Sequence, residues 1–391
     1  MWNVFLLGLV SFFADISAEM VYPIIPLYLT SVFGATPALV GVIEGVAESL
    51  ASLLKVFSGY VSDRYQKKKP IAFLGYATGL VYKAALIAAG SWVGILGARV
   101  IDRMGKGIRT APRDVMVSDS AESSRMGAAF GLHKALDMAG SAIGILIAYV
   151  LLSSARGAFD YRNLFLISMI PAFMSLAVFP FIKEKIGKRS LKERVPFWRN
   201  MKRLPGQLKL YLLVAFLFTL GNSSNAFLLL RAKSVGFGDT SVILLYFIYN
   251  VTASLLAIPL GKRSDKVGRK RLLVSGYAVF ALVYLGFAVA NNRMFMIMLF
   301  VLYGIYTAMI AGVERAFIAE ISPKELKGTM LGLHSTIVGI ALFPASAIAG
   351  ALWTAFGAAI PFLFGAGLSL AAAIILLILM KGGRQVHGVN E

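Results

Sequence analysis

The chain has 391 residues, of which 58% are hydrophobic and only 15% are charged, and it contains no cysteine. This composition excludes a soluble globular domain, which carries roughly a quarter charged residues, and the lack of cysteine excludes disulfide frameworks, thiolate catalysis and iron–sulfur clusters. The formal net charge is +20, and most basic residues lie in loops between long apolar runs. Because no separate basic domain exists, we expect no nucleic-acid partner.

Twelve apolar runs are long enough to cross a bilayer, since about 20 helical residues span its hydrocarbon core of about 30 Å. They are predicted at residues 3–31, 38–61, 70–90, 91–114, 126–153, 162–182, 209–231, 240–261, 271–290, 294–319, 328–352 and 358–380. Pro23 and Pro26 predict a kink in the first helix, because proline removes a helical hydrogen bond. The segment Met1–Val10 lacks the basic start and cleavage site of a secretory signal, so we expect this helix to be retained.

These runs predict an all-α polytopic membrane protein with two six-helix bundles. The expected divisions are an N-terminal bundle at 1–182, a basic linker at 183–208, a C-terminal bundle at 209–380 and a tail at 381–391. Ten Lys or Arg and two Glu lie between Lys183 and Lys209, and 63–69 and 262–271 are also basic. The positive-inside rule places these loops and both termini in the cytoplasm, so we expect a plasma-membrane protein that contacts anionic lipids there.

The two halves of the sequence repeat each other. Residues 59–69 match residues 261–271 at an offset of 202, and residues 127–133 match 328–334 at an offset of 201. Two unrelated motifs in nearly one register indicate duplication of a six-helix unit, and such repeats bind their solute between the halves near the bilayer midplane. The second match ends in His133 and His334, for which we expect repeat packing rather than a metal site.

The pattern Gly-x-x-x-Asp-Arg/Lys-x-Gly-Arg-Lys-Arg follows the second and eighth helices and resembles the signature loop of the major facilitator superfamily. The copy at 261–271 is complete, whereas the copy at 59–69 has Gln66 where the family usually has Gly. The resemblance implies a latch in which the loop Asp pairs with basic residues and closes the cytoplasmic side; the alternative is purely topological charge. The implied gating residues are Gly59, Asp63, Arg64, Arg113, Gly261, Asp265, Lys266 and Arg315.

Two further segments resemble motifs of the same family. Arg103-Met-Gly105-Lys106-Gly107 is similar to the motif of the fourth helix, with Lys106 where the family usually has Gln. Gly140-Ser-Ala-Ile-Gly144 resembles the antiporter motif of the fifth helix without its Pro. Close helix packing through these two glycines is still expected.

Ionisable residues within the spans are concentrated in helices 1, 2 and 4. A charge at the bilayer centre costs about 2.5 to 3.5 kcal/mol, so these groups must face one another or water. Helix depth places Asp15, Glu48 and Arg103 nearest the midplane. The repeat aligns Asp15 and Glu48 with Leu217 and Asn250, so we expect the ionisable chemistry on one side of the duplicated scaffold only.

The candidate residues fall into two groups. The proton-coupling candidates are Asp15, Glu19, Glu44, Glu48 and Arg103. The substrate-binding candidates are Arg99, Arg103, Lys106, Tyr22, Asn222, Asn225, Asn250, Tyr303 and Tyr306. The polar residues of the second half equally fit a purely structural role between helices.

The expected function is secondary active transport by alternating access, and no nucleophile–base or metal-ligand constellation indicates an enzyme. We expect a monomer that binds a small molecule, with a proton gradient in place of any cofactor or metal. An acid in helix 1 near an Arg in helix 4 resembles proton-coupled multidrug members of the family, which implies efflux of cationic or lipophilic drugs or metabolites. The alternatives are proton-coupled uptake of a small organic anion and, third, a passive channel or lipid-moving protein.

Overall fold

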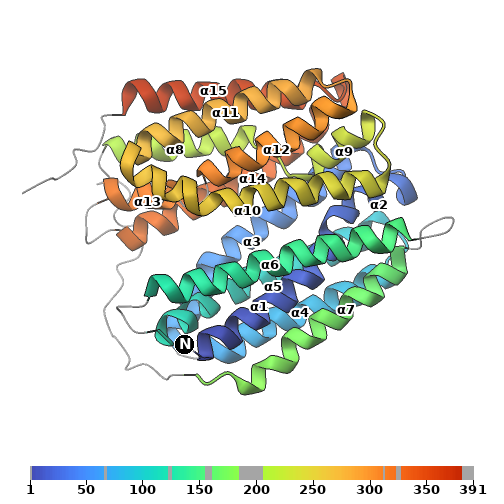
Figure 1. The fold of residues 1–391 in the computed structure, drawn as a ribbon, viewed down its shortest axis with the longest axis vertical. Helices are drawn as coiled ribbons and strands as arrows, with labels where there is room; N and C mark the ends of the chain where they lie inside the picture. The colour runs from blue at the N-terminus through green and yellow to red at the C-terminus, as the bar shows by residue number, and fades with distance from the viewer. Residues whose placement is uncertain are drawn as a thin grey trace, which may run out of the picture.

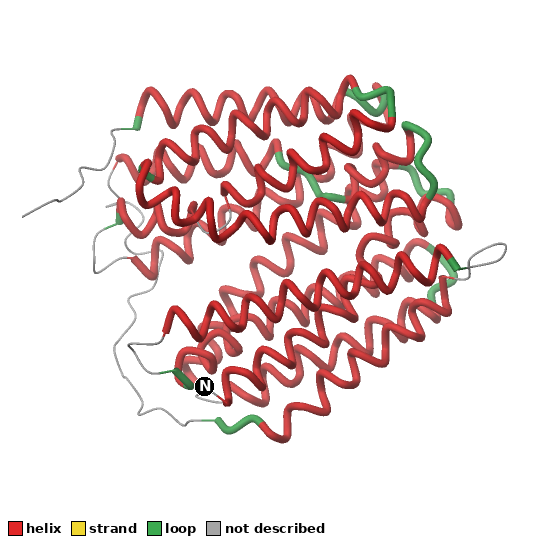
Figure 2. The backbone as a smooth tube through the Cα atoms, viewed as in Figure 1, coloured by secondary structure: helices red, strands yellow, loops and turns green. Residues whose placement is uncertain are grey.

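The computed structural model describes residues 2–65, 68–121, 126–154, 161–184, 206–310, 313–322 and 327–380. Regular structure in this part of the chain is entirely helical (Figure 2). Each of the twelve predicted runs coincides with one helix or with two or three consecutive helical segments, so the predicted fold class is confirmed.

The helices follow the order of the predicted spans. The first half contains α1 (Trp2–Val21), η1 (Tyr22–Ile24), α2 (Ile25–Phe33), α3 (Pro37–Tyr65), α4 (Lys68–Ala88), α5 (Trp92–Asp119), α6 (Met126–Ser153), α7 (Tyr161–Val178) and η3 (Phe179–Phe181). The second half contains α8 (Gly206–Gly221), α9 (Ala226–Ser234), α10 (Asp239–Val267), α11 (Arg269–Val289), α12 (Arg293–Ile310), α13 (Val313–Ile321), α14 (Lys327–Phe356) and α15 (Ile360–Leu379).

Eleven helical segments of the described residues are long and apolar enough to cross a membrane. The remaining span is α5, which has 28 residues but carries many charged side chains. The predicted kink in the first span is present, because α1 gives way to η1 at Tyr22 and Pro23 before α2 begins. The seventh span is also broken, between Gly221 and Ala226, where a short polar segment separates α8 from α9.

The two halves lie side by side as two bundles, with α1–α7 in one and α8–α15 in the other (Figure 1). They meet chiefly where α3 packs along α14 and where α6 packs against α10. Glycine permits the first of these contacts: a Cβ on Gly45 would lie 2.8 Å from the carbonyl oxygen of Phe343. The backbone N–H of Ala38 also donates to Thr354 Oγ1 at 3.0 Å.

The contacts of α3 with α14 run from Pro37 beside Gly350 to Ser52 beside Gly339. The end of the bundles opposite the N-terminus, where this row begins, we call the far end. There α3 begins at Pro37 and α14 ends at Phe356. At the same end the hydroxyl of Tyr161, at the start of α7, donates to Asp239 at the start of α10 at 3.0 Å. Two hydrogen bonds therefore join the two halves at the far end.

Glycines also allow α6 to lie directly against α1. A Cβ at Gly140 or Gly144 would meet the backbone carbonyl of Phe12 or Ile16 respectively. These are the glycines of the fifth-helix motif, so the close packing expected from them is present.

Gly140→Ala is therefore expected to lower the free energy of unfolding by about 1 to 3 kcal/mol, because a backbone carbonyl cannot move aside without shifting its helix. Thermal unfolding of the detergent-solubilised protein measures the effect. The matched control is Gly97→Ala in α5, where an added Cβ meets nothing within 4 Å. Equal unfolding temperatures for the two variants would contradict this packing.

Candidate functional site

The charged faces of α1, α3 and α5 meet inside the first bundle, as the sequence predicts. Arg99 donates from Nε to Glu44 Oε1 at 2.9 Å and from Nη2 to Glu44 Oε2 at 2.7 Å. Each of these two residues is only 1% exposed. Arg99 Nη1 also donates to Asp102 at 3.3 Å. In a bidentate pair of this kind each buried charge is stabilised by its partner. A single unpaired ion buried in the same place would be strongly unfavourable.

A second ion pair lies beside the first. Arg103 Nη2 is 2.9 Å from Glu48 Oε1, and Arg103 Nε is 3.6 Å from Asp102 Oδ2. The ring of Tyr22 packs against both guanidinium groups, with its centroid 5.3 Å from the Cζ of Arg99 and 5.4 Å from that of Arg103. Tyr22 opens η1, so the break in the first span brings an aromatic face to the arginines.

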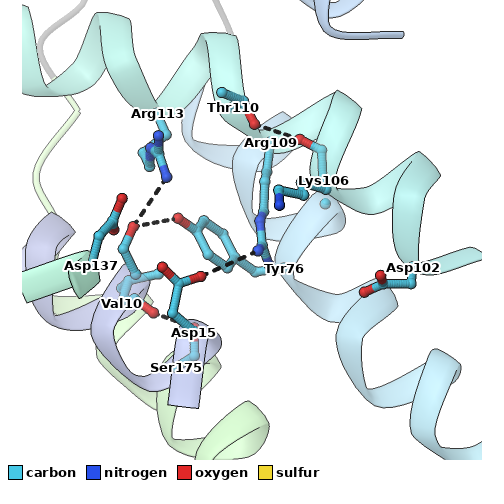
Figure 3. A network of polar contacts seen from close by, with 12 residues as sticks. Val10, Asp15, Tyr76, Asp102, Lys106, Arg109, Thr110, Arg113, Asp137 and Ser175 are labelled. Carbon is cyan, nitrogen blue, oxygen red and sulfur yellow. Dashed lines mark hydrogen bonds and ion pairs between the residues drawn. The ribbon is translucent and has the colours of Figure 1, made fainter. Parts of the chain in front are cut away.

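The other acids of the cluster are held less tightly. Asp15 Oδ1 lies 4.0 Å from Arg109 Nη2 (Figure 3). Glu19 accepts a hydrogen bond at 3.3 Å from the hydroxyl of Tyr246, which belongs to α10 of the other bundle. Among the described residues, neither Glu19 nor Lys106 forms an ion pair within 4.0 Å. These groups line one cavity together with Tyr22 and the arginines.

Below this cavity, toward the N-terminus, the polar contacts continue through Ser11. Its hydroxyl is hydrogen-bonded to Tyr76 Oη at 2.8 Å and to His133 Nε2 at 3.0 Å. Arg113 Nη1 donates to the same oxygen at 3.4 Å (Figure 3). Arg109 lies 4.4 Å over the ring of Tyr76. The cationic face of α5 is thus lined by hydroxyls and an aromatic ring.

The predicted gating residues are only partly described. Arg113 forms an ion pair with its neighbour Asp114 at 2.8 Å. Lys266 and Arg315 are exposed, and Gly261 lies in α10. The side chains at Asp63, Arg64 and Asp265 and the surroundings of Gly59 lie outside the described residues, so the latch remains a prediction.

The polar residues of the second bundle engage a group of tyrosines. Asn222 Nδ2 donates to Tyr306 Oη at 3.1 Å, and the hydroxyl of Tyr303 donates to Asn225 Oδ1 at 2.9 Å. The rings of Tyr303 and Tyr306 have centroids 5.3 Å apart. Asn250 differs, because its amide donates to the carbonyl of Tyr246 in its own helix at 2.9 Å. The predicted lining residues therefore meet in one aromatic wall, with Asn250 tied to its own backbone.

Two ionisable residues were missed by the sequence analysis. Lys83 in α4 is 2% exposed and lines a small cavity with Asp102 and Arg109. Glu314 in α13 accepts a hydrogen bond at 3.0 Å from the hydroxyl of Tyr277. The expectation that only one side of the duplicated scaffold carries ionisable chemistry is therefore wrong. The detectable signals were the lone Lys83 in the apolar run at 70–90 and the adjacent Glu314 and Arg315 in the run at 294–319.

Similar proteins identify the family. The model of the Major Facilitator Superfamily matches residues 7–231 and 210–390. An MFS-type transporter of Methanocaldococcus jannaschii is 37% identical over 383 residues, which cover 96% of this chain and 94% of that protein. A multidrug resistance efflux pump PmrA homolog of Lactococcus lactis is 24% identical, over 83% of this chain and 81% of that protein.

Solved structures show the same fold. A point mutant of the nucleoside transporter NupG superposes with a TM-score of 0.82 at 11% identity, over 97% of this chain and all (100%) of that one. A D-xylose-proton symporter superposes with a TM-score of 0.78 at 15% identity, over 98% of each chain. The resemblance seen in the sequence motifs is confirmed, and the protein is a multi-pass membrane transporter, not an enzyme, that belongs to the major facilitator superfamily.

Proposed function

We propose that this protein is a proton-coupled exporter of small cationic or lipophilic organic compounds, and that Asp15 and Glu19 exchange the coupling proton. The observation that carries the proposal is the cavity in the first bundle, where these two carboxylates lie outside the hydrogen-bonded ion pairs that hold Glu44 and Glu48. A carboxylate in direct contact with arginine stays ionised. One without that contact in a poorly hydrated site can exchange its proton.

Glu19 is favoured further by its position between the bundles. Its hydrogen bond from Tyr246 joins α1 of one half to α10 of the other. A protonated carboxyl and an ionised carboxylate differ in charge and in hydrogen-bonding capacity, so a proton on Glu19 changes a contact that must break when the halves move. Protonation and rearrangement of the bundles would thereby be coupled.

The side on which the halves separate supports export as the proposed direction. The hydrogen bonds Ala38–Thr354 and Tyr161–Asp239 join the bundles at the far end, and the positive-inside rule places the opposite end in the cytoplasm. On that orientation the cavity is loaded from the cytoplasm, as export requires. Asp63 and Asp265 would then latch the cytoplasmic side in the opposite state of the cycle.

The groups in and beside the cavity support the substrate class. Asp15 and Glu19 line the cavity, and Tyr246, which donates to Glu19, leads to a row of tyrosine rings that continues to Tyr303. Aromatic faces attract organic cations, and a free carboxylate supplies the matching charge. Relatives that carry names of multidrug resistance proteins, from Lactococcus lactis and Salmonella arizonae, support the same class.

One observation favours a second candidate, uptake of a small organic anion with protons. Lys106 is exposed and, in the described part of the chain, has no carboxylate within 4.0 Å. With Arg103 and Arg109 lining the same cavity, it could bind a carboxylate or phosphate group of a solute.

Purified protein in liposomes with an imposed pH gradient separates the two candidates. Tetraphenylphosphonium serves as the cationic probe and benzoate as the anionic probe. Accumulation of tetraphenylphosphonium against its gradient, driven by proton counterflow, is expected. Accumulation of benzoate alone, above the level in protein-free liposomes, would replace the first candidate with the second, and equilibration of both probes without dependence on pH would contradict proton coupling.

The amides of the second bundle test the aromatic wall. Asn222→Ala and Asn225→Ala each remove a hydrogen bond to a tyrosine, at 3.1 and 2.9 Å. Each variant is expected to weaken binding of tetraphenylphosphonium about three- to tenfold, which corresponds to about one hydrogen bond. The pH dependence of transport should persist, because no titratable group is lost. The matched control is Asn250→Ala, whose amide is used within its own helix; binding that is unchanged in all three variants would assign these amides to helix packing.

A further inference from the structure

A tyrosine and a histidine occupy equivalent positions in the two halves. Tyr76 and Tyr277 are separated by 201 residues, and so are His133 and His334. Tyr76 lies in α4 and Tyr277 in α11, the third span of each bundle, while the histidines lie in the fifth span, in α6 and α14. The duplicated scaffold therefore presents the same pair of side chains in each half.

The group between the tyrosine and the histidine differs between the halves. In the first bundle it is neutral Ser11, which bonds both residues and also accepts from Arg113. In the second bundle it is Glu314, whose Oε1 accepts from the hydroxyl of Tyr277 at 3.0 Å. At the same offset of 201 residues, Glu314 corresponds to Arg113. An acid thus replaces a base at equivalent positions.

The histidine of the second bundle lacks a hydrogen bond. His334 Nε2 is buried without a hydrogen-bond partner among the described residues. The nearest carboxylate oxygen, Glu314 Oε2, lies 4.0 Å away, which is beyond hydrogen-bond range. An unsatisfied buried nitrogen is unfavourable, and a proton shared between the two groups would satisfy it after a small side-chain movement.

The surroundings of Glu314 and His334 favour the charged form of the pair in some respects and oppose it in others. The Glu314 side chain is 22% exposed and that of His334 8%, so water reaches the carboxylate more readily than the imidazole. Glu314 lies in the first turn of α13, where the helix N-terminus stabilises the ionised carboxylate. Burial of the side chain has the opposite effect and disfavours the ionised form. The titratable or charged groups that face the pair from the neighbouring helices are Tyr211 of α8, Tyr277 of α11, Tyr306 of α12 and Arg315 of α13.

We propose that Glu314 and His334 together bind one exchangeable proton and form a second proton site, in the second bundle. Tyr277 positions the carboxyl, and Tyr211, whose ring stacks on the imidazole with centroids 6.1 Å apart, covers the histidine. Between the two states of this pair, one proton moves between bulk water and the Glu314–His334 pair, with no other bond made or broken. Only the role of this site in transport rests on the proposed proton coupling; proton binding itself does not.

Proton counting on the detergent-solubilised protein tests the site without any solute or gradient. A pH-indicator dye reports the protons taken up per protein between about pH 8 and pH 5, the range in which histidine sites exchange. The variants are Glu314→Gln, His334→Gln and the double variant. Glu320→Gln, an exposed acid in the same helix that pairs with Arg269 at 3.1 Å, is the matched control.

Each single variant is expected to lose about one proton, and the double variant also about one, because both residues hold the same proton. The control should keep the wild-type number. Unchanged counts in the single variants, a loss in only one of them, or a loss of two in the double variant would each overturn the shared site. If the proton counts were as expected but transport did not depend on pH, the proposed transport mechanism would be contradicted. The shared proton site would then still stand.

Discussion

Glu44→Gln is expected to lower the free energy of unfolding by about 3 to 5 kcal/mol, the largest effect on stability among the variants considered. Arg99 would then remain charged in a site where it is 1% exposed, with its bidentate partner gone. Asp102 still accepts from Arg99 at 3.3 Å, which favours the lower part of this range. Thermal unfolding in detergent measures the shift.

Burial of the ion pair is the cause of this effect, and a second ion pair isolates it. Glu320 pairs with Arg269 at 3.1 Å, but the two side chains are 37% and 32% exposed. Glu320→Gln makes the same chemical change and should alter stability by no more than about 1 kcal/mol, because water replaces the lost contact. Similar shifts for Glu44→Gln and Glu320→Gln would show that burial does not govern the Arg99 pair.

Replacing both partners distinguishes two contributions to the free energy of unfolding. One is the cost of burying an unpaired charge, and the other is the stabilisation that the ion pair itself provides. The double variant Glu44→Leu/Arg99→Leu is expected to recover most of the stability lost in Glu44→Gln, since neither buried charge remains. A double variant that is less stable than the single one would mean that the pair itself holds α3 against α5.

The sequence predicted the helices well because apolar length and loop charge decide them. The span predicted at 126–153 is α6, Met126–Ser153. It also placed acids and bases of α1, α3 and α5 on facing sides, since spacing by four residues fixes the face of a helix. Which acid meets which base depends on helix tilt and rotation, which spacing does not encode. Glu44 is thus not among the residues that helix depth places nearest the midplane, although it forms the most deeply buried ion pair.

The register of the repeat explains why Glu314 was missed. An offset of 202, taken from the loops at 59–69 and 261–271, aligns Arg113 with Arg315 and suggests two similar gates. The offset of 201 that relates Tyr76 to Tyr277 aligns Arg113 with Glu314 instead. A one-residue difference between a loop and the helices around it was therefore enough to conceal an exchange of charge. Lys83 was missed for another reason, because a single lysine interrupts the apolar pattern of its helix only briefly.

Coupling to protons provides the strongest functional prediction. Asp15→Asn and Glu19→Gln are each expected to reduce pH-driven accumulation of tetraphenylphosphonium, and the double variant should reduce it to the level of protein-free liposomes. Downhill flux should persist at a lower level, because an amide preserves the shape of the side chain but removes both the exchangeable proton and the negative charge that attracts the cation. Arg103→Ala should impair both activities, since it leaves Glu48 without the guanidinium that now lies 2.9 Å away.

The controls for this prediction distinguish coupling from general damage. Glu320→Gln should transport like the wild type, and the Asp15 and Glu19 variants should still bind the probe, more weakly, in the absence of a gradient. Glu48→Gln provides the sharper comparison, because the sequence alone ranked Glu48 with Asp15, whereas its ion pair with Arg103 disfavours proton exchange. If the Asp15→Asn/Glu19→Gln protein still concentrated the probe while Glu48→Gln did not, the coupling proton would belong to Glu48. The pair at Arg103 would then have to open during each transport cycle, since an acid held by arginine releases and rebinds a proton only when that contact is broken.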